Sequence, residues 1–247
     1  MTSKRIAVAG ATGRVGRHVV DVLTERGHDV VPVSRTHGVD VITGEGLAAA
    51  LADVDAIVDV TTGPSPDEEA ATEFFTTAAR NLQAAGAPLI VAASILGVEH
   101  SSGGYGAAKL AHERALLAGP SPVRILRAAQ FHEFVEQLMR WGRRGDVVVV
   151  PRMRTQLVAA RSVAEALADL ALAPEAPTFS EIAGPREESL PAVARLVAGD
   201  ELRIEEVSDP AEGHLYESGA LLPGPGTVLA GPTFADWLTR ERSAAPR

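Results

Sequence analysis

The sequence predicts an α/β fold with a doubly wound parallel sheet and a small C-terminal lobe. Short apolar runs, such as 6–9 and 56–60, alternate with longer segments whose apolar residues recur at helical spacing. Unbroken apolar runs of this kind are typical of strands buried on both faces, as in a parallel sheet. Pro174 and Pro177 mark a boundary. We therefore predict a dinucleotide-binding domain over residues 1–174 and a smaller substrate lobe over 175–247 that packs on it.

The first strand ends in a glycine-rich turn, Gly10-x-x-Gly13-x-x-Gly16, and a helix follows. A turn of this kind presents backbone amides at a helix N-terminus, where phosphate groups bind. We expect Gly10 to allow the sharp turn, Gly13 to let a pyrophosphate approach, and Gly16 to let the helix lie close to the strand. With a strand before it and a helix after it, the turn predicts the nucleotide-binding unit of a Rossmann fold rather than an ordinary tight turn. The expected cofactor contacts here are Gly10, Thr12, Gly13, Arg14, Val15 and Gly16.

The residues after the second expected strand, 30–33, indicate which dinucleotide binds. An acidic residue at this place would hold the ribose 2′-hydroxyl of NAD, whereas an arginine favours the 2′-phosphate of NADP. The chain reads Ser34-Arg35-Thr36 here, without an acid. Arg35 offers a forked donor to a phosphate, and Ser34 or Thr36 can add a hydroxyl. We predict NADP(H) in preference to NAD(H); the alternative is that Arg35 is a solvated loop residue.

Further cofactor contacts are expected where strands end, because the carboxyl ends of parallel strands face the ligand crevice. Thr61 and Thr62 follow the third expected strand, and they either line the cofactor or belong to a polar loop. Asp40 and Val41, in the loop after the second strand, complete the expected contacts in this part of the chain.

Periodicity and caps predict the remaining elements. A capping box that starts at Ser65, with proline at the next position, is expected to begin a helix that Gly86 ends, and Ser162 is expected to cap another. Loops are predicted around Pro223, Pro225 and Pro232, and Phe234 and Trp237 are expected to anchor the tail. Helices are predicted over 47–51, 66–85, 105–118, 131–141, 162–172 and 189–198, and further strands over 89–93, 123–126, 147–150, 156–160, 179–183 and 202–207.

One pair of residues suggests catalysis. The chain has two tyrosines and two lysines, and Tyr105 and Lys109 lie four positions apart in a predicted helix, hence on one face. A lysine ammonium beside a phenol lowers the phenol pKa, which would make Tyr105 a proton donor to a carbonyl near neutral pH. Lys109 is also expected to bind ribose hydroxyls. Ser94, at the end of the fourth strand, is expected to hydrogen-bond the reacting oxygen.

These residues give the chain a resemblance to the short-chain dehydrogenase/reductase superfamily, most of all to its atypical NmrA-like, NAD(P)H-binding branch. The resemblance covers roughly residues 5–185. It implies Ser94, Tyr105 and Lys109 as the catalytic triad and hydride transfer from a nicotinamide. The segments that carry it are Gly10-Ala-Thr-Gly13-Arg-Val-Gly16, Ser94-Ile-Leu-Gly97-Val, Tyr105-x-x-x-Lys109 and Arg127-Ala-Ala-Gln-Phe-His.

The resemblance also implies contacts after the fifth strand and shows one departure. Gln130 and Phe131 stand where the family closes over the nicotinamide. The helix asparagine that completes a catalytic tetrad in many members has no clear equivalent, and Asn81 is the nearest, poorly placed candidate. His132 is expected to be an ordinary core or surface histidine. His112-Glu113 lacks metal-ligand spacing and is expected on a helix surface.

Composition limits the other classes of function. The net charge is −9 without a basic run, which argues against nucleic acid as a partner. The absence of cysteine excludes disulfides, cysteine nucleophiles and thiolate metal sites, and no metal site is expected. No apolar run is long enough to cross a bilayer, and no signal peptide is recognised, so we expect a cytoplasmic protein without a membrane partner.

The sequence therefore predicts an NADP-dependent oxidoreductase that acts on a small carbonyl, enone or quinone as its partner molecule. A redox sensor that binds the dinucleotide and regulates a partner protein without chemistry is the competing class, since some members of the branch bind the cofactor without evident turnover. A structural subunit of a larger enzyme is a third possibility, with nothing specific in its favour. Homo-oligomers are compatible with all three.

Overall fold

A computed structural model describes residues 3–244 and confirms the α/β class. The main sheet has the strand order β12-β9-β5-β4-β3-β1-β2. The chain forms two compact units that are interleaved in sequence: unit 1 comprises the residues up to Arg127 together with Val163–Ser180, and unit 2 comprises Ala128–Ser162 together with the residues from Glu181 onward. Each unit is described by itself.

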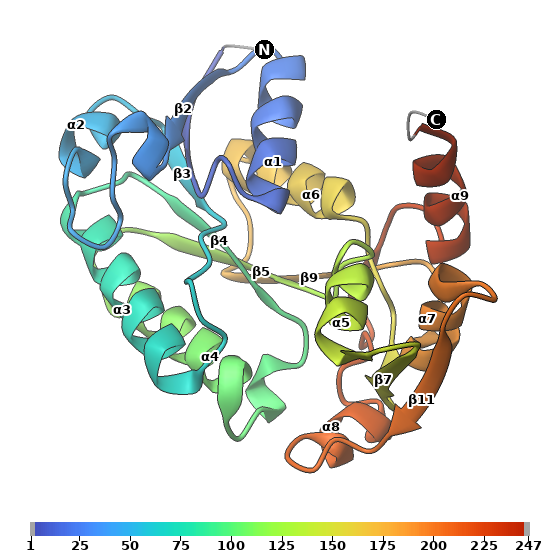
Figure 1. Cartoon of the computed structure of the whole chain (residues 1–247). Helices are drawn as coiled ribbons and strands as arrows, with labels where there is room; N and C mark the ends of the chain where they lie inside the picture. The colour runs from blue at the N-terminus through green and yellow to red at the C-terminus, as the bar shows by residue number, and fades with distance from the viewer. Residues whose placement is uncertain (1–2, 245–247) are drawn as a thin grey trace. The chain divides into compact units, whose positions relative to one another are not determined.

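Unit 1 is built as a doubly wound sheet. Helices α3 and α4 cover one face, and α1 and α6 cover the other (Figure 1). The 3-10 turns η1 (Arg35–His37) and η2 (Val98–His100) and the short helix α2 (Leu47–Leu51) lie in its loops. Its principal elements are β1 (Arg5–Ala9), α1 (Arg14–Glu25), β2 (Asp29–Val33), β3 (Ala56–Asp59), α3 (Glu68–Ala84), β4 (Ile90–Ile95), α4 (Gly104–Leu117), β5 (Val123–Ala128), α6 (Ala160–Leu172) and the start of β9 (Phe179–Ala183).

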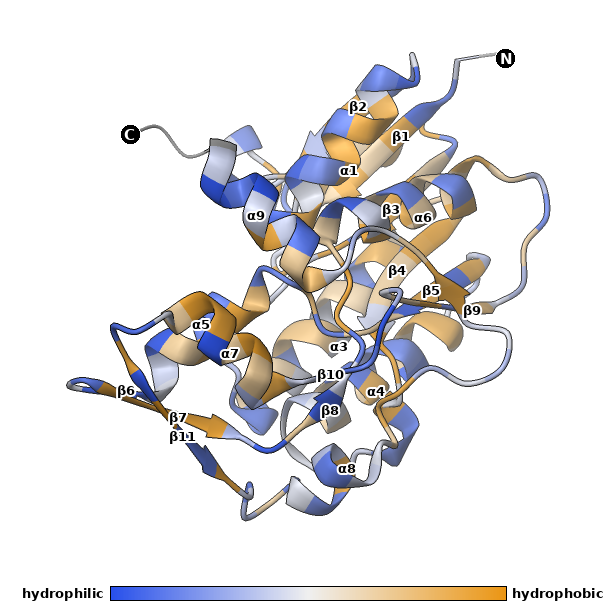
Figure 2. Ribbon diagram, turned by 90° about the vertical axis from the view of Figure 1, so that its right-hand side faces the viewer, coloured by the Kyte–Doolittle hydropathy of each residue, from blue (hydrophilic) through white to orange (hydrophobic). Residues whose placement is uncertain are grey.

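Strands β1, β2, β3 and β4 pair in parallel, and their residues align in rows across the sheet. Ala9 of β1 lies opposite Val33 of β2 and Asp59 of β3, and Asp59 lies opposite Ala92 of β4. These residues form one row across the sheet at its carboxyl edge. Strands β1, β3 and β4 are almost entirely buried, as expected for strands covered on both faces, and hydrophobic residues of the sheet are orange in Figure 2.

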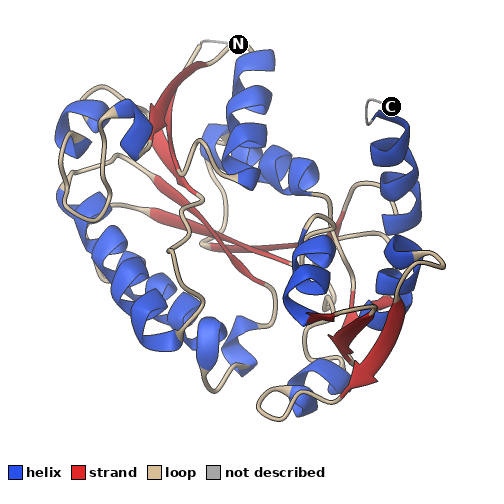
Figure 3. Cartoon of the chain, viewed as in Figure 1, coloured by secondary structure: helices blue, strands red, loops and turns tan. Residues whose placement is uncertain are grey.

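Unit 2 has its own core, formed by apolar side chains that include Val148, Val193, Leu215 and Phe234. Figure 3 shows its strands and the helices that pack on them. Small sheets form in the orders β11-β7-β6 and β10-β8, and β12 pairs in parallel with the end of β9. The elements are α5 (Phe134–Gly142), β6 (Arg143–Arg144), β7 (Val147–Pro151), β8 (Arg154–Thr155), β10 (Glu188–Ser189), α7 (Leu190–Ala198), β11 (Arg203–Val207), α8 (Gly213–Ser218), β12 (Val228–Leu229) and α9 (Phe234–Ala244).

The unit boundary differs from the predicted one near residue 174. Residues 128–162 belong with the C-terminal part, because β7 pairs in parallel with β11, more than fifty residues later in the chain. Local periodicity carries no information about such distant pairing. The assignment of one unit to the cofactor and the other to the substrate stays a prediction.

Several predicted elements are corrected. Helix α3 begins at Glu68, because the Asp67 carboxylate accepts hydrogen bonds from the amides of Glu69 and Ala70, so Ser65 is not the cap. Helix α6 begins at Ala160, whose amide donates to the Glu133 carboxylate 3.2 Å away, so Ser162 lies inside the helix. No strand forms over 156–160. Pro223, Pro225 and Pro232 lie in loops, as predicted, and the tail also contains helices α8 and α9, which were not predicted.

His132 is a core histidine of unit 2, as expected, although only one of its ring nitrogens is bonded. Nε2 donates to the carbonyl of Pro232 at 3.2 Å, and Nδ1 is buried without a partner among the described residues. The ring packs against Phe234 and Trp237, each at a centroid distance of 5.3 Å. Burial lowers the pKa of His132 to about 4, so the native side chain is neutral near pH 7.

This burial predicts a loss of stability in acid. The unfolded chain takes up a proton on this histidine below about pH 6.5, whereas the folded chain does so only near pH 4. The free energy of unfolding should therefore decrease by roughly 2 kcal/mol between pH 7 and pH 4.5 through this group alone. Denaturant unfolding of the wild type and of His132→Gln, which keeps a donor for Pro232, measures the effect. An equal decrease in both proteins would show that His132 is not its source.

Candidate cofactor and catalytic site

The geometry of the glycine turn requires glycine at two positions, 10 and 16. Gly10 has a φ of +81°, and a Cβ on it would lie 2.8 Å from the carbonyl oxygen of Val60. A Cβ on Gly16 would lie 2.0 Å from the carbonyl oxygen of Gly10. The turn is fixed by the Gly10 amide, which donates to the Val33 carbonyl at 3.0 Å. Gly10 therefore makes the sharp turn, and Gly16 lets α1 lie against it, as predicted.

The N-terminus of α1 is suited to an anion. Its cap residue, Gly13, is extended, and no described side chain caps the helix or places an acid in its first turn. A Cβ on Gly13 would meet only the Gly10 carbonyl oxygen, at 3.1 Å, so the glycine leaves open space over the turn. The side chain of Arg17 donates a hydrogen bond to the Thr12 carbonyl at 3.0 Å and so stabilises the turn. Amides of the first helical turn have no intrahelical acceptor, so a pyrophosphate fits here.

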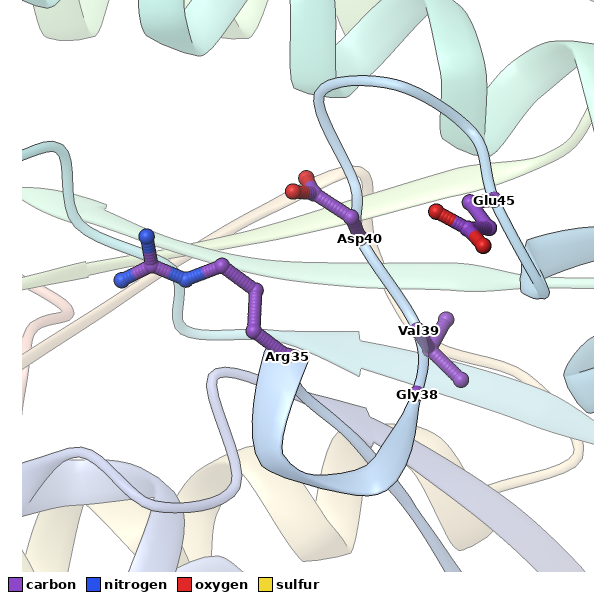
Figure 4. A pocket seen from close by; sticks show the side chains of 5 residues that line it. All are labelled: Arg35, Gly38, Val39, Asp40 and Glu45. Atoms are coloured by element: carbon purple, nitrogen blue, oxygen red, sulfur yellow. The ribbon is translucent and has the colours of Figure 1, made fainter.

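Arg35 lies in η1, immediately after β2, and lines a pocket of about 220 Å³. Its exposed guanidinium extends into open space, and the Asp40 carboxylate points toward the same space from the facing loop (Figure 4). The other lining residues are Gly38, Val39 and Glu45. The Ser34 hydroxyl is already engaged with Thr36 Oγ1 at 2.8 Å and His37 Nδ1 at 2.7 Å.

The loop with Asp40 and Val41 is held by its own bonds and by α3. The Asp40 carboxylate accepts the amide of Ile42 at 2.7 Å. Asn81 Nδ2 donates to the carbonyls of Val41 and Ile42 at 2.9 and 2.7 Å. Asn81 is therefore a structural residue that fixes this loop, which explains why it does not match the catalytic asparagine of the resembling family.

Tyr105 lies in the first turn of α4, with its hydroxyl oxygen 3.3 Å from the Thr62 hydroxyl. Its ring packs edge-on against Phe75. Burial raises the pKa of Tyr105, and the Thr62 hydrogen bond only partly opposes this. The expectation that Lys109 lowers this pKa is therefore wrong for this structure, because the lysine is directed elsewhere.

Lys109 lies one turn along α4 and is 6% exposed. Its Nζ donates to the carbonyl oxygen of Ala93 at 2.8 Å, lies 3.0 Å from Nδ1 of His112, and lies 4.4 Å from the centroid of the Phe75 ring. Burial lowers the pKa of Lys109 to about 8, while the charges of Asp59 and Glu113 act in the opposite direction. The ammonium is thus tied to β4 immediately before Ser94.

Sequence reasoning missed the partners of this lysine. His112 and Glu113 are 1% and 3% exposed, so the expectation of a helix surface is wrong. Nε2 of His112 lies 3.0 Å from Oδ2 of Asp59, and Glu113 pairs with Arg127 through both carboxylate oxygens. Asp59, a lone acid in the apolar run of β3, was the signal available in the sequence.

The remaining predicted residues fall in two groups. Ser94 lies at the carboxyl end of β4, and its Oγ is buried without a hydrogen-bond partner in the part of the chain that the structure describes. The hydroxyl of Thr61 donates a hydrogen bond to the Asp59 carboxylate at 2.7 Å, so this proton is not directed to the place expected for the cofactor. Gln130 and Phe131 belong to unit 2, where Gln130 Oε1 accepts from Thr155 Oγ1 at 2.7 Å and Phe131 forms an isolated bridge with Val158. Within residues 3–244 no group of side chains could hold a metal ion, and no helix there has the length and apolar composition needed to cross a membrane.

Residues 6–101 match the model of the NAD dependent epimerase/dehydratase family. The match confirms the resemblance to the short-chain dehydrogenase/reductase superfamily and agrees with the predicted NAD(P)-dependent enzyme class; it does not single out the NmrA-like branch. No curated protein gives a significant match.

Solved structures share the fold over nearly the whole chain. UDP-N-acetylglucosamine 4-epimerase from Bacillus cereus is 17% identical, with a TM-score of 0.70 over 99% of this chain and 98% of that one. An NADPH-dependent quinone oxidoreductase from Escherichia coli, complexed with NADPH, is 16% identical, with a TM-score of 0.70 over 96% and 99%. dTDP-4-dehydrorhamnose reductase from Bacillus anthracis, in complex with NADP, is 16% identical, with a TM-score of 0.71 over 99% and 100%. At these identities the likeness concerns the fold.

Two glycine substitutions should separate binding from folding. Gly16→Ala places a methyl group against a backbone carbonyl and should lower the free energy of unfolding by roughly 1–3 kcal/mol. Gly13→Val should leave the fold intact and abolish dinucleotide binding, because its side chain would fill the space over the turn. Thermal unfolding and NADPH titration of both variants measure this. Normal NADPH binding by Gly13→Val would place the pyrophosphate elsewhere.

Proposed function

We propose that this chain is an NADP(H)-dependent oxidoreductase that transfers hydride to a small carbonyl, enone or quinone. One observation carries the proposal most directly. The buried Ser94 hydroxyl, without a partner in the described residues, lies at the sheet edge where Thr62 holds Tyr105 and where α1 presents its N-terminus. A buried polar group without a partner is costly, and a catalytic or ligand-binding role is one of the reasons for which such a group is retained.

The residues fit the cofactor. The first turn of α1 would hold the pyrophosphate, and Arg35 would hold the 2′-phosphate of NADP from the pocket beside η1. When bound, the cofactor would supply or accept the hydride. The match to the NAD dependent epimerase/dehydratase family supports dinucleotide binding in general. The preference for NADP rests on Arg35 and on the absence of an acid at Ser34-Arg35-Thr36.

Two side chains would then act on the substrate oxygen, one by donating a proton and the other by donating a hydrogen bond. Tyr105 would donate its phenolic proton to that oxygen as hydride reaches the carbon, and Ser94 would donate a hydrogen bond to it. Because burial raises the pKa of Tyr105, the phenol keeps its proton near neutral pH and is a donor in the resting protein. Thr62, at 3.3 Å, orients the hydroxyl.

The cofactor preference is tested through Arg35. NADPH should bind about tenfold more tightly than NADH, equivalent to roughly 1.4 kcal/mol, through charge-assisted hydrogen bonds to the 2′-phosphate. Arg35→Ala should remove the difference and leave NADH binding nearly unchanged. Fluorescence titration with both cofactors measures the two affinities. Equal wild-type affinities would refute the NADP preference.

The chemistry is tested through Tyr105. Phenylalanine keeps the ring against Phe75 and removes the proton, so Tyr105→Phe should bind NADPH nearly as well as wild type and lose roughly 10²–10⁴-fold in turnover. A panel of carbonyls, enones and quinones with NADPH serves as the assay. Thr62→Val is the matched control: it keeps the phenol, and it should cost far less turnover.

A redox sensor is the second candidate, and one observation favours it. Tyr105 and Lys109 are held by different partners, Thr62 and His112, rather than by each other. A sensor would show no turnover in the wild type, no consequence of Tyr105→Phe, and an interaction with another protein that depends on the cofactor. Turnover that survives Tyr105→Phe would instead indicate a quinone reductase without a protein proton donor.

A further inference from the structure

A buried series of hydrogen-bonded side chains links Lys109 of the candidate site to β3. Lys109 Nζ lies 3.0 Å from Nδ1 of His112, and Nε2 of His112 lies 3.0 Å from Oδ2 of Asp59. Oδ1 of Asp59 accepts from both the amide and the hydroxyl of Thr61, at 3.0 and 2.7 Å. Asp59 and His112 are each 1% exposed, and the imidazole stacks on Phe75 at 5.0 Å. None of these contacts is used by the proton transfer proposed for Tyr105.

The donors and acceptors of this chain can be ordered. Burial favours the neutral form of Asp59, but the hydrogen bonds from His112 and Thr61 outweigh it, so the pKa of Asp59 is lowered. Burial and the neighbouring Lys109 charge lower the pKa of His112, so the imidazole is neutral. A carboxylate can only accept, so the proton of the imidazole lies on Nε2. Nδ1 is then left as an acceptor, and the Lys109 ammonium is the donor beside it.

We propose that His112, oriented by Asp59, is a positioning residue that fixes the Lys109 ammonium against β4. The inference rests on the function proposed above. Asp59 sets the tautomer of His112, and His112 offers Lys109 a fixed acceptor next to the carbonyl of Ala93. These two acceptors engage two of the three N–H groups of the ammonium. One N–H remains for a ribose hydroxyl or for the phenol.

Two carboxylates act on the charge of Lys109, and they come from two elements, β3 and α4. Asp59 approaches from β3, and Glu113 lies on α4 itself. Glu113 is held by Arg127 of β5 through both of its oxygens, at 3.1 and 2.8 Å. Tyr105, one turn earlier on α4, is uncharged because its pKa is raised. His112 is thus the neutral link between the two buried charges, Lys109 and Asp59.

The experiment uses a matched pair of His112 variants in the full chain. His112→Asn and His112→Leu both remove the link to Asp59, but only asparagine places an acceptor oxygen where Nδ1 stood. His112→Leu should lower turnover roughly tenfold or more, and His112→Asn should restore most of it. A purely structural role for His112 predicts equal losses in the two variants, and that result would overturn the proposal.

Nuclear magnetic resonance provides a readout without turnover. The chain has two lysines, so protein labelled with ¹⁵N-lysine gives two Nζ signals, assigned with Lys4→Arg. Lys109 should titrate near pH 8 in the wild type. Its midpoint should fall further in Asp59→Asn, because the facing carboxylate charge is lost. Ring ¹⁵N shifts should show His112 protonated on Nε2 in the wild type and on a mixture of nitrogens in Asp59→Asn.

Glu113→Gln is the control for charge alone. It also removes a carboxylate charge that acts on Lys109. Because Asp59 is unchanged, His112 should stay protonated on Nε2. A wild-type His112 protonated on Nδ1 would overturn the positioning proposal, whatever the turnover. Absence of wild-type turnover, together with the expected Nε2 proton, would instead refute only the proposed reductase function.

Discussion

The architecture of unit 1 depends on the contact between the glycine turn and the start of α1. A Cβ at Gly16 would lie 2.0 Å from the Gly10 carbonyl oxygen, so the helix lies as close to the turn as backbone atoms permit. This contact directs the N-terminus of α1 to the carboxyl edge of the sheet. The parallel register then brings Val33, Ala9, Asp59 and Ala92 into one row. Arg35, Thr62 and Ser94 all follow that row within a few residues.

The parts of this account that the sequence predicts are those governed by local rules. The class of fold, the glycine roles and the placement of Ser94 and Arg35 at the carboxyl ends of strands follow from buried apolar runs and a turn that needs glycine. The predicted start of α3 lies two residues too early. Ser65 and Asp67 are both good caps, and the structure uses the one nearer the helix.

Other parts depend on contacts between residues far apart in the chain, which local patterns do not encode. The β7–β11 pairing moves residues 128–162 into unit 2. The Tyr105 and Lys109 spacing was recognised, but the lysine is directed to Ala93 and His112 rather than to the phenol. Helical spacing places two residues on one face, yet the choice of partner depends on Asp59, which comes from β3, fifty residues earlier in the chain.

The buried lysine gives the site an unusual electrostatic character. The ammonium is paired with a carboxylate through a neutral imidazole rather than directly. Such a group tolerates burial because two of its three N–H donors are satisfied, and its pKa of about 8 leaves it charged near neutral pH. A fixed positive charge next to Ser94 suits a reaction in which negative charge develops on a substrate oxygen.

A crystal structure of the protein with NADPH would show where the cofactor binds. We expect the pyrophosphate on the amides of the first turn of α1 and the 2′-phosphate within hydrogen-bond distance of the Arg35 guanidinium. We also expect the nicotinamide at the sheet edge that carries Ser94 and Tyr105. A cofactor with its 2′-phosphate in solvent, or with its nicotinamide remote from both residues, would contradict the account.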